Sequence, residues 1–256
     1  MKTHSLILVF LLSLVVFPPE GFGQKRKPSS TRPQSAASPK PKEGGQTAVV
    51  MDETLSVLRV TPSLFADGVQ RMRRGREVRI LGATEADGVK FFKVTAEPKN
   101  YGWVQADAVF GKFRPDDEER LAKLVQAMNG FDQIELAAYF FTLYPDSKFS
   151  PAILLLFGDL CQETAVRLSK DANSRLDRRE MAASAAPMHS YFLNYVGLDR
   201  YRKLGITYRF NASTKAYYYD GASWRKLVEK FGSSPEAAEA RKRLDSLNGR
   251  SSTNAL

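Results

Sequence analysis

Two side chains of this sequence could together do nucleophilic chemistry, Cys161 and His189. A thiol is activated when an imidazole lies close enough to remove its proton. Cys161 is the one cysteine of the chain, and no histidine other than His189 follows His4. Both residues lie in stretches whose apolar spacing indicates helix-packing faces, and no glycine-rich loop or strand–turn setting presents the thiol. We therefore predict that the chain has no catalytic residues and is not an enzyme.

The acidic run Asp116–Glu119 is the other cluster that could do chemistry, as paired acids or as calcium ligands. Consecutive helical residues point in different directions around the axis, whereas carboxylates in a first turn stabilise the positive end of the helix dipole. The run therefore indicates the start of a helix. One cysteine and one histidine cannot supply the four ligands of a structural zinc site. The sequence predicts neither a metal nor a cofactor.

The start of the chain has the pattern of a secretory signal peptide over residues 1–23. A short basic segment precedes the apolar run Leu6–Phe17, and Gly21–Gly23 supplies small residues for cleavage. The run is shorter than the ~20 apolar residues that span a bilayer, so it does not indicate a transmembrane segment. The sequence thus predicts an exported protein, either periplasmic or extracellular.

Two low-complexity segments flank the part of the chain that can fold. Residues 24–46 hold Pro, Ser, Lys and Gly without aromatic or large aliphatic residues, which predicts a disordered basic linker. We predict that residues 250–256 form a flexible tail. The net charge of +10 raises nucleic acid as a partner. Export instead favours anionic envelope polymers or lipid head groups, so no nucleic acid partner is expected.

Residues 47–113 predict a small all-β domain. Asp87-Gly88 is a strong signal for a tight hairpin, and several short strands within so few residues favour a small barrel. Other turn signals separate the apolar or alternating runs, which are residues 55–60, 77–81, 89–94 and 101–104.

This part of the chain resembles a bacterial SH3-like (SH3b) domain over about residues 47–112. The order of elements carries the resemblance: an Arg-containing segment ends in a Pro turn, a basic-Gly-x-x-Val-x-Ile-Leu strand follows, and a Gly-Trp-Val strand closes the domain. The usual Asn-Val-Arg-x-Gly-Pro loop is replaced by Leu58-Arg-Val-Thr-Pro62. The resemblance implies cell-wall peptides or similar envelope ligands. The matching residues are Arg59, Pro62, Gly75, Val78, Ile80, Leu81, Gly102, Trp103 and Val104.

An aromatic groove is the expected ligand site, because SH3-like folds bind extended peptides in aromatic-lined grooves. Phe65 and Tyr101 lie near predicted turns, which favours their exposure, whereas Phe92 and Trp103 could equally belong to the core. The candidate ligand-binding residues are Arg59, Phe65, Phe92, Tyr101 and Trp103.

Residues 114–249 predict an array of helices. Apolar residues recur at helical spacing after the acidic run and again from Ile134 to Phe141. The second of these helices should end before Pro145. A longer helix from Ala152 to about Leu176 follows, and the next is interrupted or kinked at Pro187.

Two proline-containing joints lie within this array. Ser150-Pro151 and Ser234-Pro235 each combine an N-cap residue with proline at the first helical position. Each follows an aromatic turn and starts an Ala-rich helix, and this order resembles the tetratricopeptide-like (TPR-like) repeats of exported bacterial envelope proteins. The two serines are 84 residues apart, which is not a multiple of the usual ~34-residue unit, so the array contains an insert.

The insert predicts a β-hairpin at about residues 205–220. Ile206–Phe210 alternates at period two, and Lys215–Tyr219 returns to Asp220, the expected cap of the next helix.

Aromatic and basic residues are concentrated in and before this hairpin, as they are in interaction hot spots. Alternation places Tyr218 on the face opposite to Tyr217 and Tyr219, so one face must pack on the helices. We expect the other face to bind a protein partner. The candidate partner-binding residues are Tyr191, Tyr195, Arg209, Tyr217, Tyr218 and Tyr219.

These patterns favour an exported, non-catalytic scaffold or adaptor, in which the SH3-like barrel binds a cell-wall or peptide ligand and the helices hold a protein partner. Two alternatives stay open. The chain could be an accessory or regulatory subunit of an envelope enzyme such as a cell-wall hydrolase. It could also be an electrostatic binder of anionic envelope polymers, whose binding would depend steeply on salt.

Overall fold

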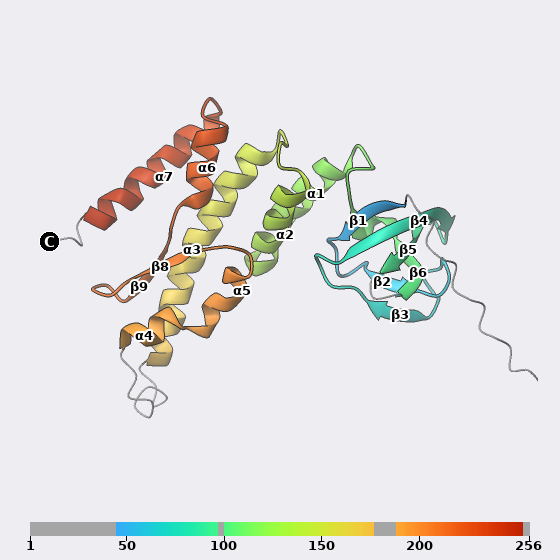
Figure 1. The fold of residues 1–256 in the computed structure, drawn as a ribbon, viewed down its shortest axis with the longest axis horizontal. Coiled ribbons are helices and arrows are strands. Elements are labelled where there is room, and N and C mark those ends of the chain that lie inside the picture. Colours follow the sequence, from blue (N-terminus) through green and yellow to red (C-terminus); the bar gives the residue numbers. More distant parts are fainter. Residues whose placement is uncertain (1–44, 97–99, 177–187, 253–256) are drawn as a thin grey trace, which may run out of the picture. The chain divides into compact units, whose positions relative to one another are not determined.

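The computed structural model of the chain describes residues 45–96, 100–176 and 188–252 (Figure 1). The predicted signal peptide, nearly all of the predicted linker, the predicted kink at Pro187 and the last residues of the predicted tail lie outside the described residues.

An antiparallel sheet of seven strands forms the first part of the described chain. The strand order is β3-β2-β6-β5-β4-β1-β7, so β3 and β7 are its edges. These two edges do not pair with each other in the described part of the chain, so the sheet is not closed into the small barrel that we predicted. The strands are β1 Gln46–Val50, β2 Val57–Arg59, β3 Gly68–Arg71, β4 Glu77–Ala86, β5 Val89–Ala96, β6 Asn100–Gln105 and β7 Val109–Phe110.

The turn residues Asp87 and Gly88 were sufficient to predict the hairpin of β4 and β5. Asp87 and Gly88 both have positive φ, 53° and 72°, as the two-residue turn that matches strand twist requires. The predicted hairpin is therefore confirmed. β4 nevertheless continues past Gly82, where the sequence predicted its end. The register shifts between Ile80 and Gly82, and this bulge lets the strand continue with altered twist.

One face of the sheet is packed into a hydrophobic cluster of its own. Along β1, β2, β5 and β6 most of its buried members alternate with partly exposed neighbours, as in a sheet with one buried face. The buried members of the cluster include Ala48, Val50, Leu58, Met72, Val78, Val94, Val104 and Val109.

The rest of the described chain is mainly helical. A short 3-10 turn η1, Ala106–Ala108, lies before β7, and a second, η2, spans Val196–Leu198. The α-helices are α1 Asp117–Ala127, α2 Gly130–Leu143, α3 Ser150–Leu176, α4 Met188–Leu193, α5 Asp199–Arg202, α6 Ala222–Lys230 and α7 Pro235–Ser252.

The helix starts agree with the sequence at two positions and differ at a third. Three carboxylates lie in the first turn of α1 as predicted, and the backbone N–H of Ala237 donates to the Ser234 hydroxyl at 3.3 Å. The predicted cap at Ser150 is wrong, because α3 already includes Ser150 and the buried Ser150 hydroxyl has no hydrogen-bond partner among the described residues. Ser147 instead accepts from the N–H of Phe149 at 3.0 Å.

The predicted hairpin in the helical part is confirmed, with β8 at Tyr208–Asn211 and β9 at Ala216–Tyr219. Figure 1 shows the hairpin crossing α3, and β9 is the strand that packs against this helix. Asp220 accepts a hydrogen bond from the N–H of Ala222 at 3.0 Å, but the N-cap position of α6 is occupied by Gly221, so the predicted cap at Asp220 is wrong by one residue.

Candidate ligand-binding surfaces

Three of the five predicted groove residues share one face of the sheet. Arg59 lies opposite Trp103 across β2 and β6, and Trp103 lies opposite Lys93 across β6 and β5. Directly paired residues point to the same face of an antiparallel sheet. Tyr101 is two residues from Trp103 on β6 and therefore points to this face as well. The Lys93 ammonium lies 5.9 Å from the Trp103 ring centroid, within cation–π range.

Phe92 belongs to the other face. It pairs with Val104 and packs into the core of the sheet with 5% of its surface exposed. The structure therefore does not bring Phe92 together with Arg59, Tyr101 and Trp103.

Phe65 is the most exposed aromatic ring that the sequence singled out. It lies in the loop between β2 and β3, and 88% of its surface faces solvent. Hydrogen bonds nevertheless fix this loop. The Ser63 hydroxyl and the Leu64 N–H both donate to one carboxylate oxygen of Asp87, at 2.7 and 2.8 Å. These two bonds, first that of Ser63, hold the pKa of the Asp87 carboxyl below its ordinary value.

Arg59 fixes the same loop from its other end. Its guanidinium donates to the carbonyl of Ala66 at 2.7 Å, and its side chain is half-buried. Arg59 thus positions the loop that carries Phe65. Because its guanidinium is already bonded to the Ala66 carbonyl, it is not a free cation for a ligand. Sequence reasoning missed Val60 and Val69, which flank this loop and are also exposed. The register shift between β2 and β3 leaves Val69 without a cross-strand partner, and no local sequence signal predicts this shift.

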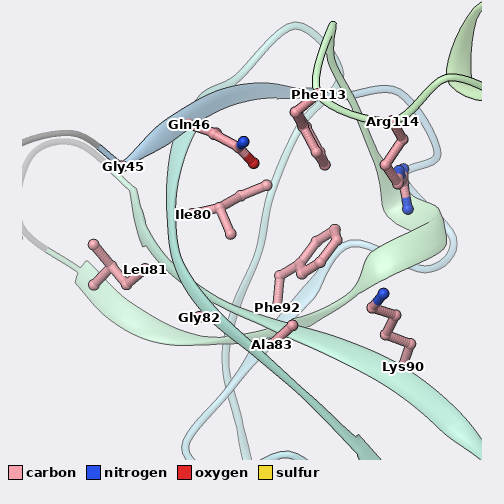
Figure 2. A pocket seen from close by; sticks show the side chains of 10 residues that line it. All are labelled: Gly45, Gln46, Ile80, Leu81, Gly82, Ala83, Lys90, Phe92, Phe113 and Arg114. Carbon is pink, nitrogen blue, oxygen red and sulfur yellow. The ribbon is translucent and has the colours of Figure 1, made fainter.

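A hollow of about 570 Å³ opens on the sheet around Phe92 (Figure 2). This volume is within the range of ~300–1,000 Å³ that is typical of small-molecule pockets. The Phe92 and Phe113 rings meet edge to face, with their centroids 5.8 Å apart. The lining residues are Gly45, Gln46, Ile80, Leu81, Gly82, Ala83, Lys90, Phe92, Phe113 and Arg114.

Two cations lie at this hollow, and only one is available to a ligand. The Arg114 guanidinium donates to the carbonyls of Ala106 and Val109 and pairs with Asp117 at 2.8 Å. Lys90 is exposed, and its ammonium lies 5.8 Å from the Phe92 ring without a carboxylate partner among the described residues. The hollow can therefore accept an apolar group that carries a negative charge.

The helical part buries most of the predicted partner-binding aromatics. Tyr195, Tyr217 and Tyr219 are at most 3% exposed. Burial is the first cause that raises the pKa of Tyr195 to about 12, and it also raises those of Tyr217 and Tyr219. Tyr191 is half-buried, and its hydroxyl donates to the carbonyl of Ala172 at 3.0 Å. These four rings serve the core of the helical part.

Arg209 and Tyr218 are the predicted partner-binding residues that face outward. They lie opposite each other in the hairpin, on the face away from the buried Tyr217 and Tyr219. Arg209 is exposed and Tyr218 is half-buried.

Cys161 and His189 lie in different environments. Cys161 is fully buried, and its burial raises the pKa of its thiol to about 12, so it is protonated at neutral pH. His189 is exposed, with its ring 5.8 Å from that of Phe210.

The burial of Cys161 predicts slow reaction with a thiol-specific reagent. At pH 8 we expect labelling in the folded protein to be at least about a hundredfold slower than in urea, because the reactive thiolate is rare. The unfolded thiol ionises near pH ~8.5, below the folded one. The stabilising contribution of the neutral thiol is therefore complete below pH ~8.5 and is lost as the pH rises towards 12. Equal labelling rates with and without urea would contradict the burial.

Comparisons with protein-family models, with curated proteins and with solved structures gave no match to this chain. Within residues 45–96, 100–176 and 188–252, no helix combines the length and the apolar character that crossing a membrane requires.

Proposed function

We propose that the chain is an exported, non-catalytic adaptor of the bacterial cell envelope, acting in the periplasm or outside the cell. Its sheet region is an SH3-like domain whose sheet stays open and which binds a cell-wall or other envelope peptide. Its helical region is a TPR-like array with a hairpin insert, and it holds a protein partner. The sequence resemblances described above support both assignments, as does the sheet-then-helix order of the elements.

The observation that carries the proposal is the presentation of Phe65. A large apolar side chain left in water is unfavourable, and here the loop that exposes it is fixed by Asp87 and Arg59. A fixed loop loses little conformational entropy when a ligand covers its ring, and such preorganisation increases affinity. Exposed apolar surface of this kind marks interaction sites.

The neighbouring face supplies the other contacts that an extended peptide needs. Tyr101 and Trp103 offer ring surface along one strand, and Lys93 offers a cation beside Trp103. Aromatic anchors with a polar rim are the usual composition of peptide-binding surfaces. We assign Phe65 the role of anchor and Arg59 that of a positioning residue.

A sedimentation assay with purified peptidoglycan, with a pull-down from envelope extract beside it, tests this function. We expect the protein to be retained by at least one of them, and Phe65→Ser to weaken binding by about 10- to 100-fold. This range follows from the ~1.5–3 kcal/mol gained when a phenylalanine side chain is buried.

Two further variants distinguish the contribution of the Phe65 ring from that of its fixed loop and from exposed apolar surface in general. Asp87→Ala keeps Phe65 but releases its loop, and we expect a smaller loss of binding than for Phe65→Ser. Val166→Ser removes another exposed apolar side chain, on α3, and should bind like the parent protein. Retention by neither material, or equal binding by Phe65→Ser and the parent, would refute the proposed function of the sheet region.

A further inference from the structure

The hairpin of β8 and β9 has two backbone edges, and the register fixes which residues point their N–H and C=O groups outward. Asp220 donates its N–H to the carbonyl of Thr207 at 3.3 Å, so this is a hydrogen-bonded pair. Such pairs alternate with non-bonded ones in an antiparallel ladder. Tyr208 and Phe210 therefore point their backbone groups away from β9, and Tyr219 and Tyr217 point theirs away from β8.

The outer edge of β9 is closed by side chains of α3. The N–H of Tyr217 donates to the Ser169 hydroxyl at 2.7 Å, and that of Tyr219 donates to the Gln162 amide oxygen at 3.2 Å. Asn173 donates to the carbonyl of Lys215 at 2.8 Å. These three α3 residues lie on one stripe of the helix and take the place of a neighbouring strand.

No described residue pairs with the outer edge of β8. In the part of the chain that the structure describes, the backbone groups of Tyr208 and Phe210 that point away from β9 have no hydrogen-bond partner. Their side chains are also partly exposed, whereas the Tyr219 and Tyr217 rings opposite them are buried. An unpaired edge strand is a template for another extended chain.

We propose that β8 binds an extended, acidic peptide segment of a partner protein by strand addition. The added strand would pair with two N–H and two C=O groups, those of Tyr208 and Phe210. Main-chain hydrogen bonds of this kind supply affinity, and alternate side chains supply selectivity.

The charge of the strand selects the acidic partner. Arg209 lies between the two open residues, is exposed and has no acidic partner among the described residues. Lys215, in the turn of the same hairpin, is likewise exposed without one. A glutamate or aspartate opposite Arg209 would form a favourable cross-strand pair.

The same charge argues against a second copy of this chain as the occupant. Antiparallel pairing of two β8 strands through Tyr208 and Phe210 places the two Arg209 side chains directly opposite each other. Like charges in that position are destabilising. An acidic partner removes this repulsion.

This inference deepens the proposed adaptor function of the helical region and does not depend on a ligand at the sheet. The two are separable by experiment, since Phe65→Ser should not alter binding at β8 and Arg209→Glu should not alter retention by peptidoglycan.

The open edge can first be tested without a partner, by amide hydrogen exchange of the whole protein. We expect the amides of Tyr208 and Phe210 to exchange at least about tenfold faster than that of Arg209, which is bonded within the hairpin. Slow exchange at Tyr208 and Phe210 would show that the edge is already covered, and would overturn the proposal.

Binding is then measured by fluorescence anisotropy with a labelled peptide of alternating valine and glutamate. We expect Arg209→Glu to weaken binding by at least about tenfold, as for loss of a charge-assisted contact. Lys112→Glu makes the same charge change at an exposed lysine of the segment between β7 and α1, and should have little effect.

A second probe, methylated on the backbone nitrogens of alternate residues, distinguishes strand addition from simple charge attraction. It keeps every glutamate but cannot donate to the carbonyls of Tyr208 and Phe210, so we expect binding to fall by about tenfold. Absence of binding by the unmodified probe, or equal binding by both probes, would refute strand addition at β8.

Discussion

Asp117→Ala should lower the free energy of unfolding by about 3 kcal/mol, because it leaves two arginines without their shared buried carboxylate. Asp117 is fully buried. One of its oxygens accepts from the N–H of Gly111 at 3.0 Å, and the other pairs with Arg114 at 2.8 Å and Arg120 at 2.9 Å. Arg114 keeps its hydrogen bond to the Ala106 carbonyl, and Arg120 keeps its ion pair with Asp107. We therefore expect a loss of stability at the lower end of the range of about 3–5 kcal/mol for a broken buried ion pair. Urea unfolding measures the change, with the m-value unaltered.

Glu119→Ala is the matched control for this prediction. Glu119 lies in the same helical turn and pairs with Lys123 at 2.7 Å, but both side chains are exposed. Exposed pairs of this kind contribute about 0–1 kcal/mol. A loss at Asp117 no larger than that at Glu119 would show that the buried cluster is not a stabilising feature.

Gly158→Ala should lower the free energy of unfolding by about 3 kcal/mol, because α3 and α6 leave no room for a methyl group. A β-carbon at position 158 would lie 2.2 Å from the indole nitrogen of Trp224 and 2.6 Å from the Ser223 hydroxyl oxygen. Trp224 is itself buried, so the ring cannot move aside freely. Thermal or urea unfolding of the single variant measures the loss.

Two further variants identify the cause. Gly82→Ala adds the same methyl group where no atom lies within 4 Å, and should change stability by less than about 0.5 kcal/mol. Trp224→Phe removes part of the obstructing ring, so Gly158→Ala should cost less in its presence than alone. Strict additivity of the two changes would contradict the steric explanation.

Local sequence signals were sufficient where a few neighbouring residues decide the structure. Asp87-Gly88 can form a tight turn with positive φ at both positions, and it does so. Ser234-Pro235 caps and starts α7 in the same local way. The period-two pattern likewise predicted β8 and β9.

Long-range packing decided the features that the sequence could not predict. The bulge after Ile80 and the shift at Arg59 depend on neighbouring strands, and they set which side chains share a face. Phe92 and Trp103 point to opposite faces because of the register of β5 and β6, in which Phe92 pairs with Val104 and Trp103 pairs with Lys93. Ser150 lost its predicted role because Ser147, which also donates to Glu118, makes the local hydrogen bond instead.

The candidate sites also combine features that local sequence predicted with features that long-range packing decided. The exposure of Phe65 was predictable from its place in a turn, but its fixation by Asp87 was not, since the two residues lie in different hairpins. Alternation in the hairpin correctly placed Tyr218 on the face opposite to Tyr217 and Tyr219. Which face would be buried depended on α3, whose contact with β9 no local pattern reveals.

The stripe of Gln162, Ser169 and Asn173 has a mechanical consequence for the hairpin. A pulling force applied along β8 would pass through the ladder to β9 and then to α3 at three separate points. Those bonds lie side by side across the direction of pull, so they would have to break together in shear and not one after another by peeling. The 27 residues of α3 would then carry the load as a stiff rod about 40 Å long.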